Sequence, residues 1–128
     1  MNGQRVAQTG SVTLGYCGAG ISVIFHLTFA ADWEASRATG EYRVSTRDRT
    51  LDEVGFIHCG FEDQVGRVAK AIFAGTSGLV LLIIDEARVR SEIRHENLGG
   101  GDEVFPHIYG PLNLDAVVEV KSYETEPS

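Results

Sequence analysis

Three of the four histidines in this chain, His26, His58 and His107, interrupt short apolar segments. The segments are IFHLT, GFIHC and FPHIY. A titratable ring inside a strand-like apolar segment costs free energy unless it is hydrogen-bonded or opens onto a cleft. Because all three histidines have such similar flanks, we expect them to share one pocket.

The residues around these histidines predict a pocket for a nucleotide. His26 and Thr28 are two positions apart, so on a strand both face the same side, and such a pair suits a ribose or an amide. Trp33, Tyr42 and Tyr109 can stack on a base or on nicotinamide, and Arg43 or Arg47 can meet a phosphate. His58 and His107 are the candidate catalytic residues, for orienting or protonating the substrate. The predicted ligand-binding residues are His26, Thr28, Tyr42, Arg43 and Tyr109.

Other interpretations of the histidines stay open. Three imidazoles can bind catalytic zinc, but these lie far apart in sequence without a His-x-His pair, so we expect no metal and rank a metal-dependent hydrolase low. Each histidine can instead be a structural group bonded to a backbone carbonyl, and the pocket can belong to a non-catalytic metabolite-binding module. Cys59 lies in an apolar segment and is expected to be an inert core residue.

The apolar pattern predicts an α+β domain with a mixed or largely antiparallel sheet and two main helices. Alanines and Trp33 precede Gly40, which indicates a helix over 30–39 with a glycine cap. Apolar positions at steps of three and four predict a second helix from residue 61 to Gly75. The predicted strands are 21–27, 41–45, 56–59, 79–85, 93–96, 103–109 and 114–120. The apolar run 79–85 should be central, and Pro106 should mark an edge or a bulge.

Length, charge and cysteine content limit the class of protein. The chain has 128 residues and a net charge of −7, which favours one soluble domain and makes nucleic acid an unlikely partner. No apolar run reaches the ~20 residues of a membrane span. Two cysteines and no secretory leader predict a reduced, cytoplasmic protein. We expect a flexible extension over 1–20, one domain over 21–122 and a tail over 123–128.

Several segments resemble the domain of unknown function 952 family. The most specific are GFIH, LVLLIID and FPHIYGPL, and the likeness spans about residues 22–121. The fold of this family is grouped with the ADP-ribosyltransferases, which implies an ADP-ribosyltransferase-like domain and NAD as a candidate co-substrate. In those enzymes a first-strand His-x-Thr holds the ribose and nicotinamide end of NAD, and His26 and Thr28 fit that motif.

The resemblance leaves the catalytic glutamate of those enzymes unassigned. Glu103 and Glu119 match it by position only, and Phe56 and His58 stand where those enzymes commonly carry a stacking tyrosine. An RNA 2′-phosphotransferase of the same fold uses arginines and a histidine in place of the glutamate. The analogous set here is Arg43, Arg47, Arg94, His58 and His107. The resemblance therefore implies an ADP-ribosyl- or phospho-transferase that binds a small nucleotide or metabolite.

Overall fold

The computed structural model describes residues 22–97 and 101–125. The extension predicted over 1–20 lies outside these residues. Within them, the class of fold is confirmed as α+β: the strands pair antiparallel throughout and two helices exceed two turns. No helix of the described residues is long and apolar enough to cross a membrane.

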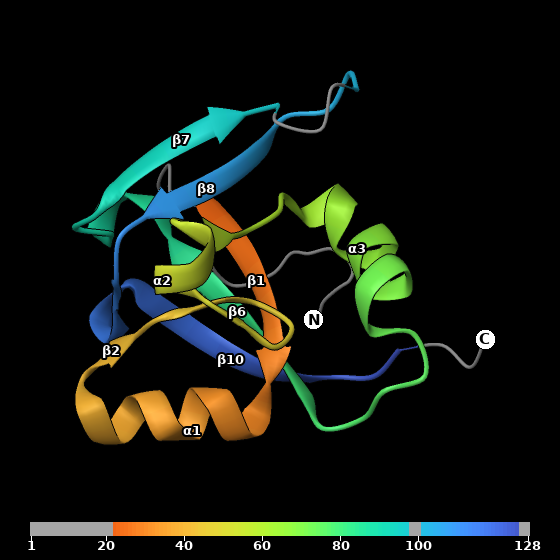
Figure 1. Cartoon of the computed structure of the whole chain (residues 1–128), viewed down its shortest axis with the longest axis horizontal. Helices are drawn as coiled ribbons and strands as arrows, with labels where there is room; N and C mark the ends of the chain where they lie inside the picture. Colours follow the sequence, from red (N-terminus) through yellow and green to blue (C-terminus); the bar gives the residue numbers. More distant parts are fainter. Residues whose placement is uncertain (1–21, 98–100, 126–128) are drawn as a thin grey trace.

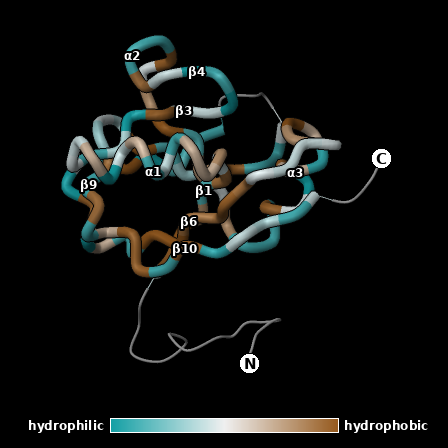
Figure 2. Tube along the Cα trace, turned by 90° about the horizontal axis from the view of Figure 1, so that it is seen from below, coloured by the Kyte–Doolittle hydropathy of each residue, from teal (hydrophilic) through white to brown (hydrophobic). Residues whose placement is uncertain are grey.

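The first sheet has β6 (Leu79–Asp85) at its centre, between β1 (Val23–Phe29) and β10 (Val117–Tyr123) (Figure 1). The continuous apolar run therefore forms a central strand, as predicted. Figure 2 shows hydrophobic residues concentrated along β6. The predicted last strand is shifted, because residues Leu114–Ala116 form a 3₁₀ turn and β10 continues to Tyr123, which pairs with Leu79.

The second sheet has β8 (Phe105–Tyr109) between β5 (Ile57–His58) and β7 (Glu92–Glu96). Backbone hydrogen bonds of 2.8 and 2.7 Å between Phe25 and Gly60 join it to β1. Pro106 lies in the central strand rather than at an edge or bulge, which corrects the prediction. The sheet accommodates the proline because β5 ends at His58, just before the position opposite Pro106. There the Pro106 carbonyl still accepts from the Cys59 N–H at 3.0 Å.

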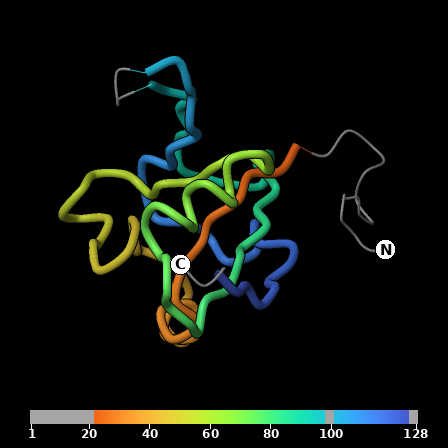
Figure 3. The backbone as a smooth tube through the Cα atoms, turned by 90° about the vertical axis from the view of Figure 1, so that its right-hand side faces the viewer, coloured from red at the N-terminus to blue at the C-terminus, as the bar shows by residue number. Residues whose placement is uncertain are grey.

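The two longer helices pack against the first sheet. α1 (Ala30–Thr39) has the predicted bounds and ends at Gly40, whose φ of 95° favours glycine. The second predicted helix begins as a 3₁₀ turn over Glu62–Gln64 and continues as α3 (Val65–Phe73). Its Ala69 and Phe73 pack with Leu27 and Leu79, so α3 covers the sheet face turned toward the viewer in Figure 3.

Short elements connect the two sheets. β2 (Glu41–Tyr42) pairs with β9 (Leu112–Asn113), and β3 (Val44–Thr46) pairs with β4 (Arg49–Thr50). α2 (Leu51–Val54) follows β4 and begins with a capping box formed by Thr50 and Glu53. A further 3₁₀ turn covers Glu86–Arg88. These short pairings bring Tyr42 and Leu112 into the main core.

Candidate functional site

The fold brings the three predicted histidines together where the two sheets meet. His58 and His107 are register partners on β5 and β8, with ring centroids 5.0 Å apart in an edge-to-face arrangement. His26 on β1 reaches the same place, because its Nδ1 lies 2.5 Å from the carbonyl oxygen of His58. The three histidines therefore lie close together, but only His26 and His58 line the cavity described below, and His107 lies behind His58.

His26 belongs to a buried hydrogen-bond chain that we call the inner network: Thr28, Tyr42, His26 and the His58 carbonyl. The His26 side chain is almost inaccessible, at 2% exposure, and Tyr42 is fully buried. The Tyr42 hydroxyl lies 2.8 Å from His26 Nε2 and is also hydrogen-bonded by Thr28. Both ring nitrogens of His26 are therefore used inside the protein.

The inner network fixes the protonation state of His26. A carbonyl oxygen can only accept, so Nδ1 carries the proton and Nε2 accepts from the Tyr42 hydroxyl. Burial lowers the pKa of His26 to about 4, and burial raises the pKa of Tyr42. At neutral pH both groups are uncharged, and they hold β1, β2 and β5 together.

A second group of side chains lies on the outward face of β5, β8 and β7, and we call it the outer cluster: Phe56, His58, Glu96, His107 and Tyr109. Glu96 Oε1 accepts from His107 Nδ1 at 2.9 Å and from the Tyr109 hydroxyl at 2.5 Å. The hydrogen bonds from Tyr109 and then His107 lower the pKa of Glu96. The outer cluster thus contains an ionised carboxylate that orients an imidazole, as in carboxylate–histidine pairs of hydrolases.

Aromatic contacts hold the outer cluster in place. The Phe56 ring stacks on His107 with centroids 4.2 Å apart, meets His58 edge-to-face and lies tilted against Tyr109. The backbone carbonyl of Phe56 accepts from the Ser45 hydroxyl at 2.5 Å. Arg94 lies over the Tyr109 ring, with its guanidinium carbon 4.3 Å from the centroid. His107 is consequently 3% exposed although it is on the outward face.

His58 is the histidine of the three whose ring is accessible. It is exposed, and among residues 22–97 and 101–125 none makes a side-chain hydrogen bond to its ring. Partial burial, and then the neighbouring charge of His107, lower the pKa of His58. At neutral pH the His58 ring is therefore an uncharged base with a nitrogen available to a ligand.

A cavity of about 130 Å³ opens beside His58, between β1 and α3. Its walls are mostly apolar. Two imidazoles line it, that of His26 from the inner network and that of His58 from the outer cluster. The lining residues are Phe25, His26, Leu27, Thr46, His58, Cys59, Gly60, Val65, Val68, Ile72, Phe73 and Leu81. Burial raises the pKa of the Cys59 thiol, so the cavity contains no thiolate at neutral pH.

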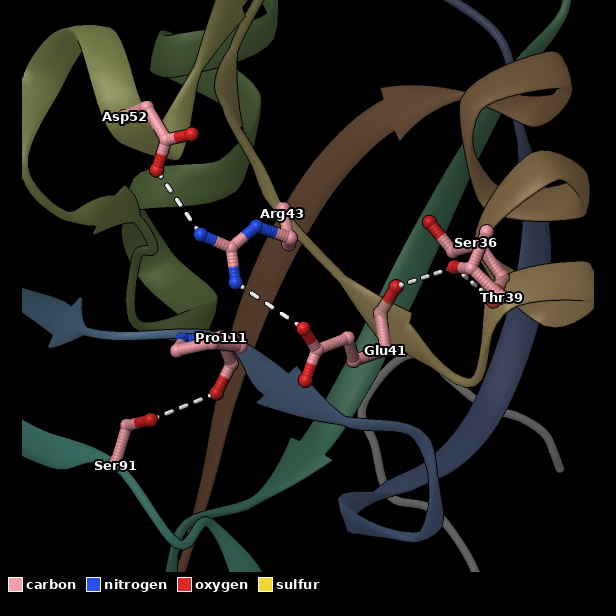
Figure 4. A network of polar contacts seen from close by, with 7 residues as sticks. All are labelled: Ser36, Thr39, Glu41, Arg43, Asp52, Ser91 and Pro111. Carbon is pink, nitrogen blue, oxygen red and sulfur yellow. Dashed lines mark hydrogen bonds and ion pairs between the residues drawn. The ribbon is translucent and has the colours of Figure 1, made fainter.

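The predicted phosphate ligand Arg43 lies away from the cavity. Figure 4 shows its guanidinium between two carboxylates, and it donates to Glu41 at 3.1 Å and to Asp52 at 2.9 Å. Arg47 is the cation beside the cavity, because it donates to the Ile72 carbonyl at 2.8 Å and its guanidinium carbon lies 5.9 Å from the Phe73 ring centroid. The structure thus associates Arg47 with the cavity and leaves Arg43 outside.

Glu96 is the residue of the site that sequence reasoning missed. The two glutamates proposed by position lie elsewhere: Glu103 pairs with Arg67 on α3, and Glu119 pairs with Lys121 along β10. Glu96 follows Glu92 and Arg94 at steps of two, so one face of β7 is charged. His107 and Tyr109 alternate in the same way on the neighbouring strand β8, and the two polar sets share one face of the sheet. This pattern is the signal from which Glu96 could have been found.

No metal centre is built from the described side chains. Within residues 22–97 and 101–125, no three His, Cys, Asp or Glu side chains are arranged to hold an ion. Glu96 and His107 are instead bonded directly to each other.

Fold and site together define a small α+β domain with a histidine-lined cavity at the junction of two antiparallel sheets. Residues 27–120 match the sequence profile of the family described as "Protein of unknown function (DUF952)". The chain belongs to this family. A comparison with curated proteins finds no match.

Solved structures of one bacterial protein share the fold. The crystal structure of protein CC0527 from Caulobacter crescentus is 27% identical, with a TM-score of 0.72 over 82% of this chain and 89% of that one. A double-mutant form of CC0527 gives 30% identity and a TM-score of 0.71, covering 82% and 89%. The solution NMR structure of CC0527 is 27% identical, with a TM-score of 0.68 over 81% of this chain and 86% of that one.

Proposed function

We propose that this protein binds a nucleotide by inserting one planar ring into the cavity beside His58. NAD, with nicotinamide as the inserted ring, is the first candidate, and ADP-ribosyl transfer is the proposed reaction. The observation that carries the proposal is the position of His58, which lines the cavity and also contacts His107 in the outer cluster. A ligand ring in the cavity would lie beside an accessible, neutral imidazole.

The cavity has the size and chemistry of a single-ring site. Its volume of about 130 Å³ is comparable with the roughly 150 Å³ apolar cavity that accommodates benzene in an engineered protein. Apolar walls with a few polar groups are typical of small-molecule sites. The size favours the six-membered nicotinamide ring over the bicyclic adenine, and Arg47 is the nearby cation for a phosphate.

His58 supplies the acid–base chemistry in this proposal. An acceptor hydroxyl attacks C1′ of the nicotinamide ribose, the bond from C1′ to the nicotinamide nitrogen breaks, and nicotinamide leaves with the bonding electron pair. The neutral His58 ring takes the proton that the hydroxyl gives up. The likeness of the family to ADP-ribosyltransferases supports this reaction class, and Arg47 and Arg94 are the residues available to a phospho-transfer variant.

A specific observation favours a second candidate, a binding module without catalysis. The residues lining the cavity, all within the described part of the chain, include no Asp or Glu. The glutamate that steadies the ribose in ADP-ribosyltransferases therefore has no counterpart there. On this alternative the cavity retains a metabolite that carries a planar ring and leaves it unchanged.

Calorimetric titration with NAD, nicotinamide and ADP-ribose tests the proposal. We expect saturable binding of NAD and nicotinamide, and loss of that binding in Val68→Phe, which fills the cavity. Val120→Phe is the matched control, because Val120 lies on β10 and is 39% exposed. Absence of binding at millimolar ligand would refute the proposal. Release of nicotinamide together with an ADP-ribosylated acceptor would establish transfer, and binding without release would establish the second candidate.

A further inference from the structure

We infer that Thr46 is a specificity-determining residue of the cavity: its hydroxyl donates a hydrogen bond to a carbonyl group on the inserted ring. The class of ligand that the cavity selects is therefore a six-membered ring with a carbonyl substituent. This inference deepens the proposed function and rests on it, because it requires that a ring enters the cavity beside His58.

The exposure of the lining residues shows which end of the cavity is its mouth. Phe25 and Phe73 are buried, so they belong to the deep end. His58 and Ile72 are exposed and Thr46 is half-buried, so these three lie at the mouth. Burying a polar group without a partner costs free energy. A ring with one polar substituent therefore binds best with its apolar edge at the deep end and the substituent at the mouth.

Thr46 and His58 are the lining residues whose side chains keep strong hydrogen-bonding groups for a ligand. Within the described part of the chain, neither the Thr46 hydroxyl nor the His58 ring makes a side-chain hydrogen bond. His26 also lines the cavity, but both of its ring nitrogens are used inside the protein. The Cys59 thiol is only a weak donor. The polar groups available to a ligand thus lie at the mouth.

Thr46 is held at the mouth by the hydrogen bonds of its two neighbours in sequence. On one side, the Ser45 hydroxyl donates to the Phe56 carbonyl at 2.5 Å, just before β5 begins. On the other side, Arg47 donates at 2.8 Å to the carbonyl of Ile72 in the last turn of α3. β3 is therefore tied both to the segment that leads into β5 and to α3. The Thr46 backbone is fixed before a ligand arrives, which lowers the entropic cost of binding.

The proposed reaction leaves the Thr46 hydroxyl for the ring substituent. His58 is the base that takes a proton from the acceptor hydroxyl, so its ring is not used to hold the ligand. A threonine hydroxyl can donate to a carbonyl oxygen, and nicotinamide carries such an oxygen. A site that hydrogen-bonds a ligand group discriminates against an analogue that lacks the group. Because Thr46 is half-buried and water reaches its hydroxyl, we expect the bond to change affinity by about tenfold.

The test is calorimetric titration of the wild-type protein, Thr46→Val and Thr46→Ser with three ring compounds. Nicotinamide and 3-acetylpyridine carry the carbonyl, and 3-ethylpyridine has nearly the same shape without it. Thr46→Val keeps the shape of the side chain and removes the hydroxyl. It should weaken the binding of nicotinamide and of 3-acetylpyridine by about tenfold and change that of 3-ethylpyridine by less than about twofold. Thr46→Ser, the matched control, keeps the hydroxyl and should bind all three in the wild-type order.

The pattern across the three compounds decides the inference. An equal effect of Thr46→Val on all three, or no effect on any, would overturn it, because the hydroxyl would then be solvated and of no use to the ligand. Weaker binding of nicotinamide alone would also overturn it, since the hydroxyl would then accept from the amide nitrogen. The unchanged binding of 3-ethylpyridine shows that the variant cavity is intact. If the wild-type protein binds none of the compounds, the proposed function itself fails, and this inference fails with it.

Discussion

The inner network and the outer cluster use histidine in opposite ways, although they meet at one residue. In the inner network, His26 is buried and bonded through both ring nitrogens. In the outer cluster, His58 is exposed, and among the described residues its ring has no hydrogen-bond partner. The backbone carbonyl of His58 accepts the hydrogen bond from His26 in the inner network, while its ring lines the cavity. A histidine's chemistry is therefore set by which of its atoms the fold has already used.

The same comparison separates two kinds of predicted ligand residue. Tyr42 and Thr28 are buried in the inner network, where they position His26. Tyr109 and His107 lie in the outer cluster, bonded to a carboxylate that is itself partly exposed. A direct contact of His26, Thr28 or Tyr42 with a ligand stays a prediction, and the structure gives each of them a role in stability. The following variants test this division of roles, in order of decreasing effect.

His26→Ala should cause the largest loss of stability. It removes two buried hydrogen bonds and leaves the Tyr42 hydroxyl and the His58 carbonyl without their partner. Unsatisfied buried groups cost about 1–3 kcal/mol each, so we expect a loss of about 4 kcal/mol in the free energy of unfolding. Urea denaturation measures it. His95→Ala is the matched control on β7, where it removes one exposed hydrogen bond to Glu86, and it should change the value by less than about 1 kcal/mol. Equal effects of the two variants would contradict the account.

Mild acid should destabilise the protein through the same histidine. The pKa of His26 is about 4 in the folded state and about 6.5 in the unfolded state, so the unfolded state binds the additional proton between these values. The free energy of unfolding therefore falls as pH falls from about 6.5 to about 4, by about 3 kcal/mol in total. Urea denaturation at pH 7, 6 and 5 measures the slope. His26→Gln should flatten this slope. An unchanged slope in that variant would mean that groups other than His26 cause the loss of stability in acid.

Tyr42→Phe should have a smaller effect than His26→Ala. The ring keeps its packing against Trp33 and His26, but Nε2 of His26 loses its donor. We expect a loss of about 2 kcal/mol in the free energy of unfolding, measured in the same urea experiment. Thr28→Val removes only the hydrogen bond between Thr28 and the Tyr42 hydroxyl, so its loss in the free energy of unfolding should be smaller. An unchanged free energy of unfolding in Tyr42→Phe would mean that the hydroxyl contributes nothing to the inner network.

His58→Ala should have the smallest effect on stability and the clearest effect on binding. Its ring is exposed and meets Phe56 and His107 in edge-to-face contacts, so we expect a loss of under about 1 kcal/mol. The backbone carbonyl that holds His26 remains. Calorimetry with nicotinamide should show at least tenfold weaker binding in this variant. Unaltered affinity would remove His58 from the proposed site.

Local sequence patterns predicted the elements better than the contacts between them. α1 has its predicted bounds because Gly40 ends it, and β6 is central because both its faces are apolar. The flanks of the histidines predicted one shared pocket, and two of the three, His26 and His58, line the cavity. Tyr42 was expected to stack on a ligand, and its burial follows from the two-residue pairing of β2 with β9, which is too short for periodicity to reveal.

Glu96 shows why one polar residue of the site escaped prediction. It stands 11 residues before His107, and its contact depends on the antiparallel register of β7 with β8. Register is set by the whole sheet and its turn, so a single sequence does not specify it. Arg43 was assigned to a phosphate because cations suit phosphates, yet it is bonded to Glu41, two residues before it, and to Asp52 on α2. In both cases one partner, Glu96 or Asp52, is brought into contact by the pairing of short elements that a single sequence does not specify.

The most direct test of the division between inner network and outer cluster is a long-range nitrogen–proton NMR spectrum of the histidine rings at pH 7, recorded while nicotinamide is added. We predict that His26 shows the neutral form with the proton on Nδ1 and keeps its signals throughout. The His58 ring signals should move progressively and saturate. Saturable movement of His26 with an unaffected His58, or a His26 ring protonated on Nε2, would contradict the account.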